Sequence, residues 1–246
     1  MTNENAEDKA TQSGMPSGAE TGSEMGRAAP AAREEAPDMQ GLGAISGSST
    51  ATEADRYNTL GITQAGQGMA LQAIASFSKA IELDPENAGY YYNRGIAHAN
   101  DGALPLALED FTRALELRGE DADILNNRGN IYAMMGNPDA ALADLTRCIE
   151  LNPNQPEPYN NRAAVYAQKE DYMAAMLDFG KAVSIKPQYA EALFNLARVN
   201  ARVGNCDLAS SHLRDAIYLQ PAYKQVARAV GDFDACRGQP GFTVSL

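Results

Sequence analysis

The chain has few of the side chains from which catalytic and metal sites are built, with two histidines and three cysteines in 246 residues. No group of them has the spacing of a zinc site, and neither a P-loop nor a dinucleotide-binding motif is present. The sequence Gly66-Gln67-Gly68 is typical of a turn between helices rather than of a phosphate-binding loop. No arrangement of serine, histidine and aspartate rises above chance. We therefore expect a protein that is not an enzyme and that uses no metal or cofactor.

The sequence also lacks a long apolar run, because no stretch reaches the ~18 residues of a membrane span. Its N-terminus, Met1 to Asp8, has neither a basic start nor an apolar core, so neither a signal peptide nor a transit peptide is expected. The net charge is −12. An acidic chain without a basic stripe is poorly suited to nucleic acid or to an anionic membrane. These features predict a cytoplasmic protein whose partners are proteins or peptides, not nucleic acid or membrane.

What the sequence does contain is an internal period of 34 residues, without insertion or deletion through five cycles. Its most regular position is an alanine in every cycle: Ala73, Ala107, Ala141, Ala175 and Ala209. Apolar residues within a cycle are spaced three and four apart, which is the period of an α-helix. Turn signals such as Gly136-Asn137-Pro138 break the middle of the cycles. Each cycle therefore predicts a helix, a tight turn and a second helix.

This pattern resembles the tetratricopeptide repeat. The first cycle fills the family's aromatic, leucine, glycine, alanine, phenylalanine, alanine and proline positions with Tyr57, Leu60, Gly61, Ala73, Phe77, Ala80 and Pro85. The resemblance implies five repeats, at residues 54–87, 88–121, 122–155, 156–189 and 190–223. It also implies an all-α fold, a right-handed α-solenoid of five helix-turn-helix hairpins.

Two segments flank the repeats. Residues 1–53 are rich in small and acidic residues and poor in large apolar ones, so we expect a disordered acidic tail. Residues 224–246 are expected to form a capping helix over the open face of the last repeat, followed by a short tail. The apolar residues of that cap have helical spacing: Val226, Val230 and Phe233.

The three cysteines have different settings. Cys148 fills a small, buried position of the repeat and is interpreted as a core residue. Helical packing would bring Cys206, at the start of the last repeat's second helix, close to Cys236 in the cap. A disulfide and two unrelated thiols both fit the sequence, and a disulfide would conflict with a cytoplasmic location.

Comparison of the cycles separates a charged pair from the packing positions. The middle three cycles carry arginine where the outer two carry leucine, and aspartate where the outer two carry serine or histidine. Because the two residues appear together, we expect ion pairs between the two helices of one repeat: Arg94–Asp110, Arg128–Asp144 and Arg162–Asp178. Partly exposed pairs of this kind would contribute about 1 kcal/mol at most. They are expected to be structural and not part of an active site.

Asparagine recurs at one position of four first helices, although it is a mediocre helix former: Asn93, Asn127, Asn161 and Asn195. One explanation is hydrogen bonding between helices. The other is a row of carboxamides on the inner surface that binds the backbone of an extended peptide. In the second case the column resembles the asparagine ladder of O-linked N-acetylglucosamine transferase and of some nuclear import adaptors.

Neighbouring positions of the first helices would enlarge this groove. Further carboxamides are Asn58, Asn126, Asn130 and Asn160, and the expected apolar anchors are Tyr92 and Phe194. Arg198 and Arg202 lie one turn apart, so they either hold an acidic side chain or a carboxylate or form a solvated charged face. The clamp with which related repeats hold the C-terminal carboxylate of heat-shock chaperones is matched only at Asn93, and we do not expect it in the first three repeats.

Together these features predict a non-catalytic interaction module that binds an extended or helical segment of a partner protein in a concave groove. Two alternatives are a self-associating scaffold and an accessory subunit that regulates a separate enzyme. The sequence does not specify the oligomeric state.

Overall fold

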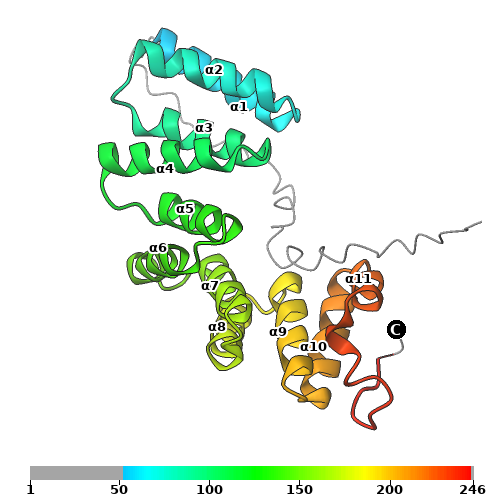
Figure 1. Cartoon of the computed structure of the whole chain (residues 1–246). Coiled ribbons are helices and arrows are strands. Elements are labelled where there is room, and N and C mark those ends of the chain that lie inside the picture. Colours follow the sequence, from blue (N-terminus) through cyan, green and yellow to red (C-terminus); the bar gives the residue numbers. More distant parts are fainter. Residues whose placement is uncertain (1–51, 245–246) are drawn as a thin grey trace, which may run out of the picture.

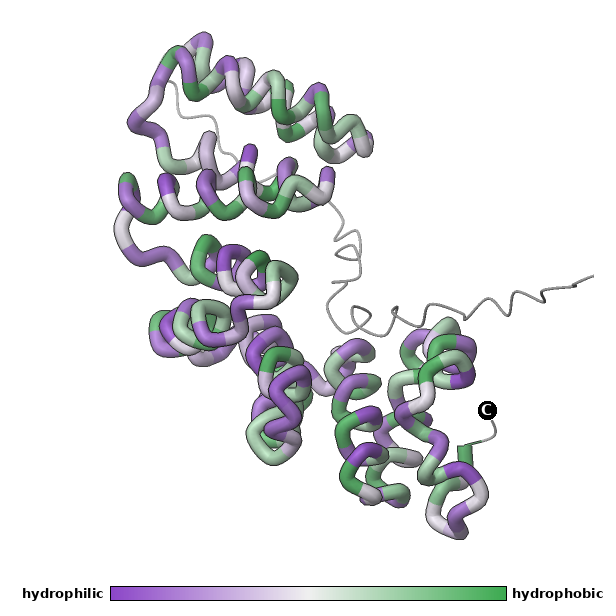
Figure 2. The backbone as a smooth tube through the Cα atoms, in the orientation of Figure 1, coloured by the Kyte–Doolittle hydropathy of each residue, from purple (hydrophilic) through white to green (hydrophobic). Residues whose placement is uncertain are grey.

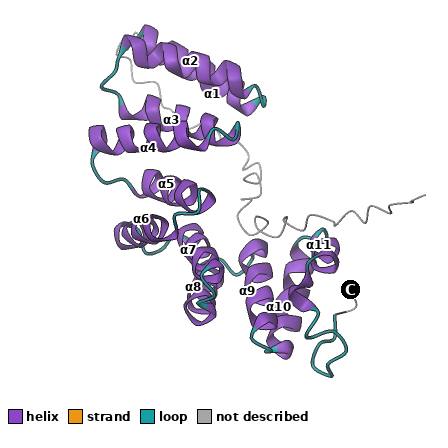
Figure 3. Ribbon diagram, in the orientation of Figure 1, coloured by secondary structure: helices purple, strands orange, loops and turns teal. Residues whose placement is uncertain are grey.

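The computed structural model describes residues 52–244, so the expected disordered tail lies almost entirely outside the described residues. Within the described range the chain forms helices joined by short loops and no strand (Figure 3). The first five are α1 (Glu53–Gly66), α2 (Ala70–Leu83), α3 (Ala88–Asn100), α4 (Leu104–Arg118) and α5 (Ala122–Met134). The array continues with α6 (Pro138–Leu151), α7 (Pro156–Gln168), α8 (Tyr172–Ile185), α9 (Ala190–Arg202) and α10 (Cys206–Leu219). The predicted all-α solenoid of helical hairpins is confirmed.

Each hairpin is held by the recurring small residues of the period. All five recurring alanines have no exposed surface. A Cβ atom on Gly61 would lie 2.6 Å from the ring of Phe77, and one on Gly95 would lie 2.9 Å from the ring of Phe111. The first helix therefore approaches the aromatic ring of the second more closely than a larger residue allows. Apolar and polar residues alternate along the helices, as an array buried on one side of each helix requires (Figure 2).

The hairpins stack into a curved array, with α1 and the C-terminal segment at opposite ends (Figure 1). The odd-numbered helices contact one another from repeat to repeat, whereas the even-numbered helices make at most sparse contacts with each other. The closer spacing of the odd-numbered helices places them on the inner side of the curve. The residues expected to form a groove all lie on these helices.

The expected capping helix is wrong in its extent. The helix α11 (Tyr223–Ala229) ends after seven residues, Val230 is extended, and the 3₁₀-helix η2 (Gly231–Phe233) follows. Ala227 and Phe233 are fully buried, whereas Val226 is 42% exposed. A continuous helix would have kept Val226 and Phe233 on one face. The turn at Val230 redirects the chain, so that Phe233 reaches the core of the last repeat.

Cys206 and Cys236 form a disulfide, with their Cα atoms 5.3 Å apart. Of the two arrangements that fit the sequence, the structure therefore has the bonded one. Cys148 is free and buried, as expected for a core residue. The disulfide attaches the cap, which we define as residues 222–244, to the first turn of α10.

Candidate functional site

Three arginines on α3, α5 and α7 each form a two-point ion pair with the aspartate sixteen residues later, on the second helix of the same repeat: Arg94–Asp110, Arg128–Asp144 and Arg162–Asp178. Their separations are uniform, as in Arg128, where Nε lies 2.7 Å and Nη2 lies 2.9 Å from the two oxygens of Asp144. These hydrogen bonds raise the pKa of each arginine.

Each arginine has a third partner that the sequence reasoning missed. Its Nη1 donates to a hydroxyl on the second helix of the preceding repeat: Ser78 at 3.1 Å, Thr112 at 3.4 Å and Thr146 at 3.1 Å. The signal was present in the sequence, because this hydroxyl position becomes Gly180 in the cycle just before the one in which the arginine becomes Leu196. One arginine thus links three helices across a repeat boundary. We call this three-helix contact the arginine bridge.

The recurring asparagines also bond between repeats. The Nδ2 of Asn93 donates to Oδ1 of Asn58 at 2.8 Å, and the Nδ2 of Asn161 donates to Oδ1 of Asn126 at 2.9 Å. Asn195 donates to Asn160 over 3.4 Å in the same way. Hydrogen bonding between helices is therefore one role of the column. It uses one of the two N–H groups of each of these asparagines.

Asn127 departs from this arrangement because position 92 is a tyrosine. Its Nδ2 donates to the hydroxyl of Tyr92 at 3.1 Å and to the carbonyl of Asp123 at 3.0 Å. Burial raises the pKa of Tyr92. Tyr92 therefore supports the contact between α3 and α5, and its ring packs at a tilt against Phe111. Asn130, also on α5, is half-buried.

The other half of each carboxamide pair is available to a ligand. Within residues 52–244, no donor bonds Oδ1 of Asn93 or Asn161, and no acceptor bonds Nδ2 of Asn58 or Asn126. None of these atoms is among the buried side-chain atoms that lack a partner, so solvent reaches them. The inner side of the array thus displays an acceptor beside a donor at two places.

On α9 the expected groove residues turn out to meet the cap. Phe194 is 4% exposed and stacks on Tyr223 with ring centroids 4.5 Å apart. It is not an anchor open to a partner, and that expectation is wrong. The cause is Tyr223 at the start of α11, which covers the inner face of the last repeat.

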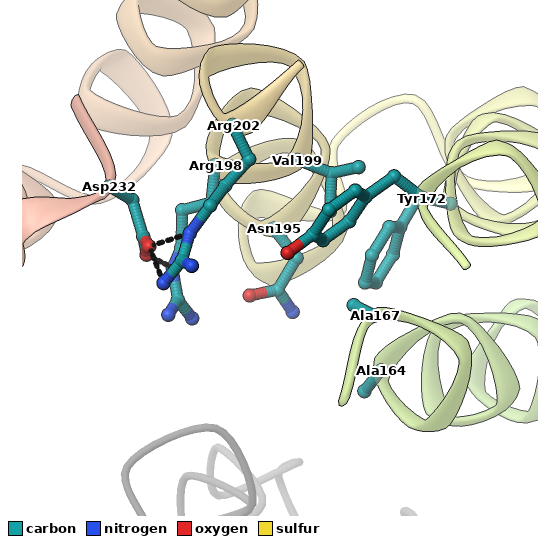
Figure 4. A pocket seen from close by; sticks show the side chains of 9 residues that line it. Ala164, Ala167, Tyr172, Asn195, Arg198, Val199, Arg202 and Asp232 are labelled. Carbon is teal, nitrogen blue, oxygen red and sulfur yellow. Dashed lines mark hydrogen bonds and ion pairs between the residues drawn. The ribbon is translucent and has the colours of Figure 1, made fainter. Parts of the chain in front are cut away.

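Arg198 and Arg202 hold an acidic side chain, and it belongs to the same chain. The Nε atoms of both arginines lie 2.5 Å from an oxygen of Asp232, whose side chain is 3% exposed (Figure 4). This contact gives the short helix η2 a fixed place on α9. A solvated charged face, the other interpretation of these arginines, does not describe them.

Beside this ion cluster lies a pocket between α7, α8 and α9 (Figure 4). Its cavity volume is about 20 Å³, and the empty space over its lining, open solvent included, is about 360 Å³. Its lining is apolar on one side and charged on the other: Ala164, Ala167, Tyr172, Phe179, Val199, Asn195, Arg198, Arg202 and Asp232.

Glu191 lies in the first turn of α9, and it accepts a hydrogen bond from Nδ2 of the buried Asn160 at 3.2 Å. Burial raises the pKa of the Glu191 carboxyl, against the smaller opposing effect of that hydrogen bond. The folded state therefore holds this proton more tightly than the unfolded chain does. The contribution of the Glu191 carboxyl to the free energy of unfolding is therefore fully present below its pKa in the unfolded chain. It is lost as the pH rises through its pKa in the folded state.

We expect Glu191→Gln to raise the midpoint of thermal unfolding at pH 7 and to leave it nearly unchanged at pH 4. Glutamine keeps an oxygen for Asn160 and carries no buried charge. Thermal scans of both proteins from pH 4 to pH 8 measure the difference. An advantage of the variant that is equally large at both ends of this range would contradict the assignment.

Other kinds of site are not found in the described part of the chain. Between residues 52 and 244, no cluster of histidine, cysteine, aspartate and glutamate could hold a metal ion. None of the described helices is both long and apolar enough to cross a bilayer.

The comparisons with known proteins agree with the hairpin array. Family models of the tetratricopeptide repeat match residues 122–155 and 145–176, and a TPR repeat model matches residues 71–102. The protein is a tetratricopeptide repeat (TPR) protein. Proteins of this family generally serve as protein-interaction modules. Among curated protein sequences, none matches this chain.

Solved structures with a similar fold include other TPR proteins. The crystal structure of YrrB, described as a TPR protein with an unusual peptide-binding site, is 26% identical, covers 72% of this chain and 93% of its own, and has a TM-score of 0.57. PilW, a type IV pilus biogenesis factor, is 20% identical with coverages of 75% and 89% and a TM-score of 0.65. MamA from Desulfovibrio magneticus RS-1 is 20% identical with coverages of 69% and 96% and a TM-score of 0.63.

Proposed function

We propose that this TPR protein binds an extended segment of a partner protein along the inner side of its array, without catalysing a reaction. The observation that carries the proposal is the hydrogen-bonded pair of asparagines on α1 and α3, Asn58 and Asn93, which recurs on α5 and α7 as Asn126 and Asn161. In each pair one carboxamide oxygen and one carboxamide nitrogen have no partner within residues 52–244. In each pair the internal hydrogen bond fixes both side chains and leaves one acceptor and one donor at the surface. A peptide backbone offers the complementary N–H and C=O groups whatever its sequence.

The same geometry explains how one asparagine column serves two roles. Each internal hydrogen bond holds the pair rigid, so little side-chain entropy is lost when a peptide binds. The two sites of contact lie two repeats apart, which suits an extended segment that follows the inner helices. YrrB, whose title names a peptide-binding site, has a similar array, and this likeness supports the proposal.

Substitution of Asn58 and Asn126 by aspartate separates the two roles. Aspartate keeps the oxygen that accepts from Asn93 or Asn161, and it removes the donor that faces the groove. We expect Asn58→Asp/Asn126→Asp to fold normally and to bind captured partner segments about thirtyfold more weakly, because two hydrogen bonds of ~1 kcal/mol each are lost. The measurement is affinity purification of partners with the full chain, followed by titration of the captured segments.

A charge-matched control uses two asparagines outside the groove. Asn137 and Asn152 lie at helix ends, where their oxygens accept from backbone N–H groups, and aspartate preserves that acceptance. Asn137→Asp/Asn152→Asp adds the same charge and should leave binding unchanged. If the groove variant retained every partner at full affinity, the proposed binding mode would be refuted.

The compartment is part of the proposal as well. The disulfide between Cys206 and Cys236 is typical of oxidising compartments and weighs against the cytoplasmic location expected from the sequence. We propose that the protein works where this disulfide persists. Counting free thiols in protein taken directly from its native source, under denaturing conditions without reductant, should give one thiol per chain rather than three.

A further inference from the structure

The boundary between repeats 4 and 5 differs from the other repeat boundaries. It lacks the arginine bridge, since Leu196 and Gly180 stand in place of the arginine and the hydroxyl. Repeat 4 also carries a small residue, Ala164, on its first helix, where the first three repeats carry a larger one. At the position of Ala164, the first three repeats carry Ile62, Ile96 and Asn130. The pocket described above lies at this boundary, and Ala164 is part of its lining.

The pocket combines an apolar floor with a cationic rim. Ala164, Val199 and the ring of Phe179 contribute apolar surface, and Arg198 and Arg202 stand beside it. Two arginines meet one carboxylate, that of Asp232, so one positive charge is not compensated by it. Asp232 engages Arg198 through Nε, and the outer nitrogens of Arg198 point away from Asp232 (Figure 4). They bond no other residue within residues 52–244.

We propose that this pocket is a specificity subsite of the groove, which takes an apolar side chain of the partner segment and holds a neighbouring aspartate or glutamate on Arg198. The subsite rests on the proposed peptide-binding function and adds sequence preference to it. Charge complementarity identifies the acidic residue, because a guanidinium with two unused NH₂ groups matches a carboxylate in a two-point contact. The floor between α7 and α9 identifies the apolar neighbour.

Asn195 connects this subsite with the inner surface that carries the carboxamide pairs. It belongs to the recurring asparagine column, lines the pocket, and donates to Asn160. A segment that follows the inner helices from α1 would therefore reach the pocket at α9. The partner segment then carries its acidic and apolar residues at the end that lies nearest the cap.

Ala164→Ile tests the apolar part of the subsite without a new risk to the fold, because isoleucine occupies this position in repeats 1 and 2. The matched control is Ala164→Ser, which keeps the volume small. Arg198→Gln tests the charge, since Arg202 still pairs with Asp232 in that variant. Thermal unfolding and a free-thiol count verify that each variant keeps its fold and its disulfide.

The probe is a phage-displayed library of random twelve-residue peptides, selected on the full-length protein. We expect recovered peptides to share an apolar residue within two positions of an aspartate or glutamate. Ala164→Ile should reduce their recovery about tenfold and Ala164→Ser should not. Arg198→Gln should remove the preference for the acidic residue.

The outcomes separate the subsite from the groove. Peptides that are recovered without this pattern, or equally well by Ala164→Ile and Arg198→Gln, would overturn the subsite and leave the groove proposal standing. Recovery no higher than that of a control without protein would overturn both. Lower recovery of all peptides by Asn58→Asp/Asn126→Asp, together with the selective losses above, supports both.

Discussion

Arg128→Leu is expected to destabilise the middle of the array by about 3 kcal/mol. The substitution leaves Asp144, whose side chain is 11% exposed, without its ion-pair partner in the described structure. It also releases the hydroxyl of Thr112 on the preceding repeat. This cost exceeds the ~1 kcal/mol expected as the net contribution of the pair, because removal of one partner leaves a nearly buried carboxylate that was contacted at two points.

The double variant Arg128→Leu/Asp144→Ser separates two effects: the loss of the ion pair itself, and the cost of leaving the Asp144 carboxylate buried without a partner. It reproduces the residues of repeat 1, which carries Leu60 and Ser76. We expect it to regain most of the stability lost by Arg128→Leu. Because neighbouring repeats can unfold separately, the measurement is hydrogen exchange of the amides in α5 and α6. A double variant as unstable as the single one would show that the stranded carboxylate is not the cause.

The second large effect is expected from Cys236→Ser. The disulfide closes a loop with a sequence separation of 30, and its loss should cost about 3–4 kcal/mol of local stability. Only the cap and the last repeat should respond, because each repeat contacts mainly its neighbours. Hydrogen exchange should speed up in α10 and in residues 222–244, and protection in α3 to α6 should stay the same.

Cys148→Ala is the control for the loss of a sulfur atom. Alanine occupies this position in the other four repeats, at Ala80, Ala114, Ala182 and Ala216, so the packing accepts it. This variant should keep its disulfide and its exchange pattern. If Cys236→Ser left exchange in the last repeat unchanged, the cap would be held by Phe233 and Asp232 alone.

The sequence predicted best where five copies could be compared. The period located the hairpins, and the joint appearance of arginine and aspartate indicated contacts that the structure contains. The hydroxyl that completes each arginine bridge is also a recurring position, but it lies on the preceding repeat, so a comparison of positions within one repeat does not link it to the arginine.

Prediction failed where only one copy of a feature exists. The cap has no sequence to compare with it, so neither the turn at Val230 nor the covering of Phe194 by Tyr223 could be predicted. The acidic partner of Arg198 and Arg202 was foreseen as a kind of group but not as Asp232, which is 34 residues from Arg198. The asparagine column permitted two roles because sequence alone does not show which atoms of a carboxamide are already bonded.

The arginine bridges have a mechanical consequence. They tie each repeat to its neighbour from α2 to α8. No bridge joins α8 to α9, because Gly180 on α8 and Leu196 on α9 stand in place of the hydroxyl and the arginine. The last repeat and its disulfide-bound cap are held to repeat 4 without such a bridge, by apolar packing around Leu196 and by the hydrogen bond from Asn195 to Asn160. A segment bound in the pocket beside Ala164 would add contacts across this unbridged boundary.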